Sequence, residues 1–198
     1  VRAMRRGRSP EGEHYYPAFP YPSYTKMDEA DLAHLWAWLR ELPPIAKPNL
    51  PHELTRYKRR GPLAFWKLLE LERGPLPEDP ELDLELARGR YLVEAVGHCG
   101  ECHSPRNRIG ATRARHELAG SDADPEPGPN ITPHAEGLAS WTVEDWQTFL
   151  SLAMTPDGDF VGGEMGRVVR EGTAPLSEAD RRAIARWMVE GVEPRPDP

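Results

Sequence analysis

Apolar residues recur with helical spacing in four segments of the chain, residues 27–42, 83–97, 142–154 and 177–191. Almost no stretch alternates between apolar and polar residues with a period of two, so no strand is expected. The pattern predicts an all-α fold with long loops. Eight residues are expected to face a core from the first two segments: Leu32, Leu35, Trp36, Leu39, Leu86, Leu92, Val93 and Val96.

Capping residues support the boundaries of the last two segments. Thr142 precedes the third helix with Asp145 three residues later, which is the spacing of a capping box. Ser177 is expected to cap the fourth helix, and Gly191 is expected to end it. Met154 and Met188 fall within these two helices and are expected to fill the core.

Proline-rich stretches at residues 43–52 and 74–80 divide the chain. Proline fixes its own backbone and restricts the residue before it, so both stretches are expected to be stiff linkers or loops. Three parts follow from this division: residues 1–42, a bridge at residues 43–80, and a domain at residues 81–198.

The chain also contains an internal echo, because residues 9–39 resemble residues 155–188. Ser-Pro-Glu-Gly in the first answers Thr-Pro-Asp-Gly in the second, and Glu-Ala-Asp heads the helix that follows each. Trp38 and Trp187 then occupy the same helical position. The echo indicates two copies of one unit, of which the first lacks its front half; two ordinary capped helices after ordinary turns are the alternative.

Charge and apolar content argue against two classes of protein, those that bind nucleic acid and those that span a membrane. The net charge of −7 argues against nucleic acid as a partner, because phosphate binding requires a basic surface. No apolar run approaches the roughly 20 residues that cross a bilayer. The opening "VRAMRRGRSP" has neither a helix cap nor the features of a secretory signal, so we expect it to begin inside an element already under way.

The only two cysteines, Cys99 and Cys102, lie in "CGECH" and are followed at once by His103. Cys-x-x-Cys-His is typical of covalent attachment of haem c: one helical turn presents both thiols to the vinyl groups, and the histidine to the iron. A thioredoxin-like dithiol would need a preceding strand, a zinc site a fourth ligand, and a disulfide a better geometry. These alternatives stay open at lower weight.

A low-spin haem commonly takes methionine opposite histidine. Met165 lies in the glycine-flanked stretch "FVGGEMGRVV", which is expected to be a loop, and we choose it as the axial ligand. His116 and His134 are the alternatives. The long segment between His103 and the third helix is expected to wrap the haem, with Arg106, Asn130 and Trp141 as partners of the propionates or as purely structural residues.

Residues 81–198 resemble a class I cytochrome c domain. More narrowly, "GHCGECHSPRN", "NITP", "PDGDFVGG" before Met165, and "ADRRAIARW" look like the dihaem or multihaem cytochrome c subunits of bacterial periplasmic dehydrogenases. Residues 6–32 resemble the second half of the first haem domain of that family, with Met27 at its axial-methionine position, and residues 51–70 resemble its interdomain bridge.

The chain departs from that family in having no Cys-x-x-Cys-His upstream of residue 42. We therefore expect one haem c, and a second only with further upstream sequence. Without the missing half-domain, an aromatic patch would be exposed on the first part. Its members would be Tyr15, Tyr16, Phe19, Tyr21 and Tyr24.

The resemblance implies an electron-transfer protein rather than an enzyme. It would carry single electrons from a dehydrogenase subunit to a downstream cytochrome or oxidase, in the periplasm or on the outer face of the bacterial cytoplasmic membrane, with any membrane association through a partner. The alternative is a haem enzyme or sensor with an open sixth position. An arginine cluster beside the attachment motif is expected to meet an acidic partner or to serve solubility. It comprises Arg106, Arg108, Arg113 and Arg115.

Overall fold

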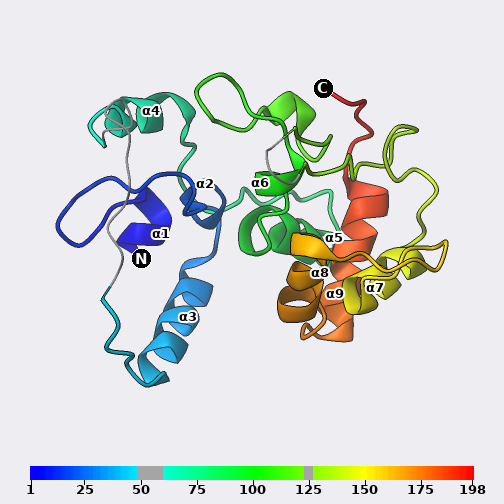
Figure 1. The fold of residues 1–198 in the computed structure, drawn as a ribbon, viewed down its shortest axis with the longest axis horizontal. Coiled ribbons are helices and arrows are strands. Elements are labelled where there is room, and N and C mark those ends of the chain that lie inside the picture. Colours follow the sequence, from blue (N-terminus) through cyan, green and yellow to red (C-terminus); the bar gives the residue numbers. More distant parts are fainter. Residues whose placement is uncertain (49–59, 123–126) are drawn as a thin grey trace. The chain divides into compact units, whose positions relative to one another are not determined.

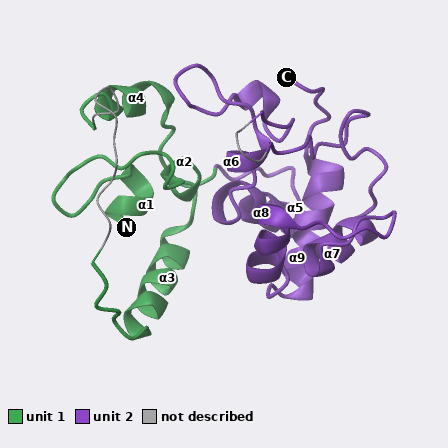
Figure 2. Cartoon of the chain, in the orientation of Figure 1, with its two compact units in different colours: residues 1–76 green, residues 77–198 purple. Residues whose placement is uncertain are grey.

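The structure is a computed structural model that describes residues 1–48, 60–122 and 127–198. The chain divides into two compact units, residues 1–76 and 77–198 (Figure 2). In the described residues all regular structure is helical, and extended pairing is limited to isolated bridges such as Arg106 with Thr112 (Figure 1). None of the helices in this part of the chain combines the length and the apolar character needed to cross a bilayer.

The second unit begins with α5 (Leu84–Tyr91), which continues into a wider π-helical turn, η1 (Leu92–Val96). The remaining elements of this unit are α6 (Gly100–His103), η2 (Ala114–His116), α7 (Val143–Leu152), α8 (Gly163–Val168), η3 (Val169–Thr173), α9 (Glu178–Arg186) and η4 (Trp187–Gly191).

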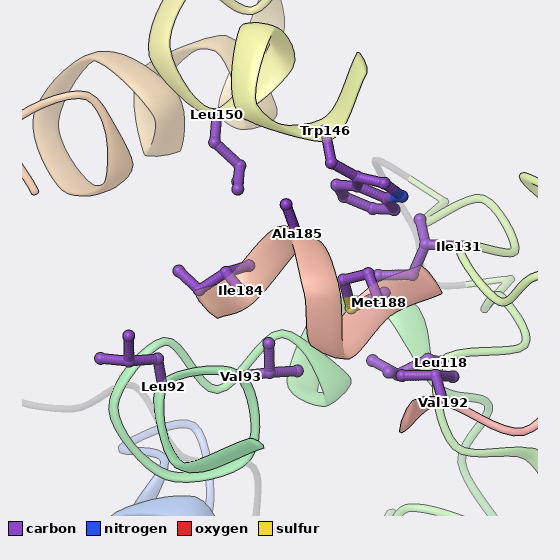
Figure 3. Close-up of a cluster of buried hydrophobic side chains, with 10 residues drawn as sticks. All are labelled: Leu92, Val93, Leu118, Ile131, Trp146, Leu150, Ile184, Ala185, Met188 and Val192. Carbon is purple, nitrogen blue, oxygen red and sulfur yellow. The ribbon is translucent and has the colours of Figure 1, made fainter. Parts of the chain in front are cut away.

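The core of this unit forms where α9 packs against both α5 and α7. Gly89 permits the close approach of α5, because a Cβ there would lie 2.0 Å from the carbonyl oxygen of Ala183. Figure 3 shows the apolar side chains that converge from these helices and from the loop segments around them. The cluster consists of Leu92, Val93, Leu118, Ile131, Trp146, Leu150, Ile184, Ala185, Met188 and Val192.

The predicted caps are confirmed at both helices. The backbone N–H of Asp145 donates to Thr142 Oγ1 over 3.2 Å and that of Thr142 donates to Asp145 Oδ2 over 2.9 Å, which completes the capping box. Ser177 Oγ accepts from the N–H of Asp180 over 3.0 Å, and the last helical turn ends at Gly191.

The first unit contains α1 (Arg2–Arg6), α2 (Tyr21–Tyr24), α3 (Glu29–Glu41) and α4 (Leu63–Glu70). Lys67 of α4 is buried, and its Nζ donates to the carbonyl oxygens of Arg6 at 3.0 Å and Gly7 at 2.5 Å. It also lies 4.2 Å from the centre of the Tyr21 ring. Burial, together with two nearby arginines, lowers the pKa of Lys67 to about 8.

The described part of the predicted bridge is not a free linker, because residues 60–76 belong to the first unit. The N–H of Leu76 donates to Lys26 O over 3.0 Å, and that of Gly74 donates to Thr25 Oγ1 over 3.2 Å. Helix α4 was not predicted, since the surrounding prolines indicated loop. Residues 49–59 of the bridge lie outside the described residues.

The internal echo is visible in local backbone structure. Gly7 and Ala153 both end a helix in the left-handed region, with φ of 55° and 56°. The turn that follows each is closed by the same hydrogen bond, Ser9 N to Glu13 O and Thr155 N to Asp159 O, both 2.9 Å. One turn motif is therefore built twice in the chain.

Two expectations for the first unit differ from the structure. Of the stripe predicted on α3 only Leu32 is buried, whereas Trp36 is 60% exposed and Leu39 45%. The predicted aromatic patch is also wrong at Tyr21, which is fully buried under α4, while the other four rings are half-buried. The exposed apolar surface of this unit therefore lies on α3 and α4 instead.

Candidate functional site

Helix α6 brings the three residues of the attachment motif together. Cys99 forms its N-cap, and its carbonyl oxygen accepts from the N–H of Cys102 at 3.2 Å and of His103 at 3.0 Å. Cys99 is half-buried against the apolar core cluster, Cys102 is exposed, and His103 is buried. One helical turn, residues 99–103, thus carries two thiols and an imidazole.

The imidazole of His103 is held in one orientation. Its Nδ1 donates to the carbonyl oxygen of Pro129 over 2.9 Å, which leaves Nε2 as the unprotonated nitrogen of the neutral ring. Burial lowers the pKa of His103, partly opposed by this hydrogen bond. A neutral imidazole whose second nitrogen is fixed by a backbone carbonyl is the form that ligates a metal.

The loop after α6 packs closely against the motif and forms hydrogen bonds with its backbone. A Cβ at Gly128 would lie 2.2 Å from the carbonyl oxygen of Cys102, so only glycine fits there. Ser121 Oγ donates to that same oxygen over 2.6 Å, and the N–H of Gly120 donates to His103 O over 2.8 Å. Gly128, Pro129 and Ser121 were not predicted as site residues, although "PGP" at residues 127–129 indicates a constrained close approach.

The two thiols are both free. Burial raises the pKa of the Cys99 thiol to about 11, so it is protonated at neutral pH and is not a reactive thiolate. Within residues 1–48, 60–122 and 127–198, no three His, Cys, Asp or Glu side chains gather as a metal-binding group. Disulfide and zinc chemistry therefore gain no support from the described geometry.

Met165 lies on helix α8, where a loop was expected. Its half-buried side chain packs against a second apolar cluster, formed by Phe149, Ala153 and Val169. Trp141 contacts both this cluster and the core cluster against which Cys99 packs. The structure therefore connects the surroundings of Met165 and of Cys99 through one indole ring.

The other methionines occupy different places. Met188 is buried in the main core, as expected. Met154 was expected inside a helix, but it follows the end of α7 and forms an isolated bridge with Phe160.

The three residues predicted to bind the propionates have different contact partners, and no contact joins them into one group among the described residues. Arg106 is bonded to Glu101, with Nη2 to Oε2 at 2.7 Å. The buried amide of Asn130 donates to Arg195 O at 2.8 Å and to Asp197 Oδ1 at 3.0 Å. Trp141 stacks edge-on against Trp146 and Phe149 at 5.1 and 5.3 Å between ring centroids.

The two alternative histidine ligands are also placed. His134 Nδ1 accepts from the N–H of Glu136 over 3.2 Å on a surface turn. His116 lies in η2, where its buried Nδ1 has no hydrogen-bond partner among the described residues. Among the described residues, no hydrogen bond joins the side chain of either of them to that of His103.

Met27 is buried directly before Asp28, the N-cap of α3. Counted from the caps of α3 and α9, its counterpart in the second unit is Leu176. Counted from the shared turn, the counterpart of Met165 is Phe19. Met27 and Met165 therefore occupy different positions relative to the shared turn and the helix that follows it, and the axial role of Met27 stays a prediction of the family resemblance.

A helical unit with a Cys-x-x-Cys-His turn, a backbone-fixed imidazole and a methionine-bearing helix before the last helix defines the class of c-type cytochrome domains. No protein-family model matches the chain. Comparison with curated proteins nevertheless finds homologues that are cytochromes c.

The chain is homologous to dihaem cytochromes c and to cytochrome c subunits of bacterial dehydrogenases. It is 44% identical to a "Diheme cytochrome c-type" of Cereibacter sphaeroides over 189 residues, which covers 94% of the chain and 62% of that protein. It is 32% identical to the fructose dehydrogenase cytochrome subunit of Gluconobacter japonicus over 191 residues, 94% of the chain and 39% of the relative.

A third relative is the cytochrome c subunit of the quinone alcohol dehydrogenase of Gluconacetobacter polyoxogenes. It is 33% identical over 200 residues, which covers 94% of the chain and 42% of that subunit. The chain thus spans less than two thirds of the length of each of these three relatives.

Proposed function

We propose that the chain is an electron-carrying c-type cytochrome that holds one haem c through Cys99, Cys102 and His103. The observation that carries the proposal is the buried imidazole of His103 with Nδ1 bonded to Pro129 O, next to two free thiols on the same turn. Homology to cytochromes c implies the same cofactor. The haem iron supplies reversible one-electron chemistry when bound.

The chain's own residues position the cofactor and its fifth ligand. Cys99 and Cys102 would attach the haem covalently, and the Pro129 carbonyl holds the ring orientation of His103 and increases its basicity. Met165 would be the second ligand besides His103, supported by its place beside the apolar cluster that Trp141 joins to the surroundings of Cys99. A haem held by both residues would supply electron transfer rather than substrate binding, so we propose a carrier and not an enzyme.

The first unit is proposed to be the second half of another cytochrome domain. Its support is the shared turn at residues 7–15 and 153–161, followed in each unit by a helix headed Glu-Ala-Asp. The proposed partners are a dehydrogenase subunit upstream and a cytochrome or oxidase downstream, in the periplasm or on the outer face of the cytoplasmic membrane. Relatives named as dehydrogenase cytochrome subunits support these partners.

The proposal is tested by expression in a host that matures c-type cytochromes, followed by intact mass and visible spectra. We expect the mass of one added haem, sharp bands after reduction with dithionite, and a weak far-red band in the oxidised protein from sulfur-to-iron coordination. Absence of added mass would overturn the haem assignment. A high-spin spectrum would show an open sixth position instead.

Two variants test whether Met165 or Met154 ligates the iron together with His103. Met165→Ala is expected to abolish the far-red band and lower the reduction potential while haem attachment persists, because a thioether ligand stabilises ferrous iron. Met154→Ala is the matched control and is expected to keep both the band and the potential. Loss of the band in the control alone would transfer the ligand role to Met154.

A further inference from the structure

The loop that follows the attachment motif carries a concentration of positive charge that the rest of its unit lacks. Residues 77–198 contain 23 Asp and Glu against 12 Lys and Arg, whereas residues 103–116 contain four arginines and no acidic residue. We call residues 105–116 the arginine loop; it directly follows α6 in the green part of the chain (Figure 1).

The arginine loop has a defined backbone. Its base is closed by the N–H of Arg113, which donates to Pro105 O over 3.0 Å, and its tip by Asn107 N to Ala111 O over 2.8 Å. Asn107 Oδ1 also accepts from the N–H groups of Ile109 and Ala111, each at 3.0 Å. Because its own bonds fix the turn, the loop presents its side chains from a pre-organised scaffold.

Of the four arginine side chains of this loop, one forms an ion pair and three are exposed to solvent. Arg106 is bonded to Glu101 on α6, with Nη2 to Oε2 at 2.7 Å. Arg108, Arg113 and Arg115 are exposed, and none of them forms an ion pair with another described residue. At the tip, Ile109 is 54% exposed. An apolar tip surrounded by charged side chains has the composition of a small protein interface.

We propose that the arginine loop is the docking surface for an acidic face of a protein redox partner. The inference rests on the proposed function, because the loop begins two residues after His103 and so borders the attachment turn on which Cys102 is exposed. These three guanidinium groups, which have no ion pair among the described residues, attract an acidic surface and orient it toward the attachment turn. The acidic remainder of the unit repels the same surface elsewhere.

The test uses the full chain with haem attached and measures oxidation of the ferrous protein by small charged reagents. Ferricyanide, an anion, stands in for an acidic partner, and tris(phenanthroline)cobalt(III), a cation, is its opposite. We expect the ferricyanide rate to fall as ionic strength rises, although the whole chain is negative, and the cobalt rate to rise.

The variant Arg108→Glu, Arg113→Glu, Arg115→Glu is expected to react with ferricyanide at least about fivefold more slowly at low ionic strength. Arg2→Glu, Arg6→Glu, Arg40→Glu is the matched control, with the same change in net charge at exposed arginines of the first unit. It is expected to change the rate less than about twofold. Both variants must keep the wild-type visible spectrum.

Equal rates for the two variants, or a wild-type ferricyanide rate that rises with ionic strength, would overturn the docking assignment while leaving the proposed function intact. A chain that attaches no haem would overturn both. Sedimentation with phosphatidylserine vesicles tests whether the loop binds anionic lipid instead of a protein. If the wild type and the control variant bind the vesicles and the loop variant does not, the arginine loop is a lipid-binding surface and the proposal is contradicted.

Discussion

Gly128 is the residue on which the geometry of the motif most directly depends. Since a Cβ at this position would lie 2.2 Å from the carbonyl oxygen of Cys102, the backbone must shift in any variant. Gly128→Ala is therefore expected to displace the neighbouring Pro129 carbonyl from His103 and to lower the yield of protein with haem attached. The yield is measured as the ratio of haem absorbance to protein absorbance.

A matched glycine provides the control. Gly158 lies on a turn where an added Cβ meets nothing within 4 Å, although its φ of 88° makes Gly158→Ala strained. That variant is expected to cost stability, on the order of 1 kcal/mol, without changing haem yield. Equal haem yields for the two variants would show that the contact at Gly128 is relieved without disturbing His103.

At the level of elements, Arg186 contributes to the ion pairs that join α5 to α9, alongside Arg88 with Asp180 and Arg182 with Glu85. Arg186 of α9 contacts Asp83, the N-cap of α5, at 3.1 Å, Glu85 at 2.8 Å and Glu190 at 2.7 Å. Arg186→Gln is expected to lower the free energy of unfolding only modestly, since these are partly exposed pairs in a network. Thermal unfolding followed by circular dichroism measures this; an unchanged midpoint would mean that solvent replaces the network without loss.

The carboxylates at this junction predict how stability depends on pH. The Arg186 guanidinium lowers the pKa of Glu190, and Arg88 lowers that of Asp180. A carboxyl whose folded pKa lies below its unfolded value stabilises the protein above the unfolded pKa, and this contribution is lost as pH falls through the folded pKa. Unfolding free energy is therefore expected to fall below about pH 4. In Arg186→Gln the fall is expected to be shallower, which acid titration of stability checks.

Substitution of two tryptophans at equivalent positions of α3 and α9 tests whether the two helices are equally buried. Trp38 of α3 is 55% exposed, whereas its counterpart Trp187 is half-buried beside the main core. Trp187→Ala is expected to cost about 2 kcal/mol and Trp38→Ala less than about 0.5 kcal/mol. Urea unfolding compares the two. Similar losses would mean that the exposed face of α3 is covered by another molecule in solution.

Elements with both a periodic stripe and a cap could be predicted from the sequence, and those with neither could not. Residues 143–152 (α7) and 178–191 (α9 with η4) combine apolar spacing with a capping hydroxyl, so they were placed to within one or two residues. Helices α4 and α8 were missed because prolines and glycines indicated loops, and tertiary packing decides their structure: Lys67 anchors α4, and Gly166 brings α8 close to Val161.

The site residues likewise divide into those that a local sequence pattern predicts and those that it does not. Cys99, Cys102 and His103 are recognisable from spacing alone, because one helical turn sets their positions. Pro129 is 26 residues from the histidine it binds, and no local pattern reports such a contact. Asn130 is a comparable case, since its amide bonds a tail 65 residues away, which no sequence period encodes.

At the scale of the whole molecule, the two units carry opposite charge. Residues 1–76 contain 13 Lys and Arg against 9 Asp and Glu, while residues 77–198 are strongly acidic. A chain with such charge segregation is expected to bind both cation- and anion-exchange resins at low salt near neutral pH, which chromatography checks directly. Retention on the anion exchanger alone would show that the acidic unit dominates.

The tail of the chain has a practical consequence for anyone handling this protein. Asn130 and Thr132, next to the carbonyl that orients His103, are tied to Arg195 and Asp197. Residues 195–198 supply those ties from far along the chain. A variant that ends at Pro194 is expected to keep its covalent haem but to change its reduction potential, because the segment that carries Pro129 is then held less firmly.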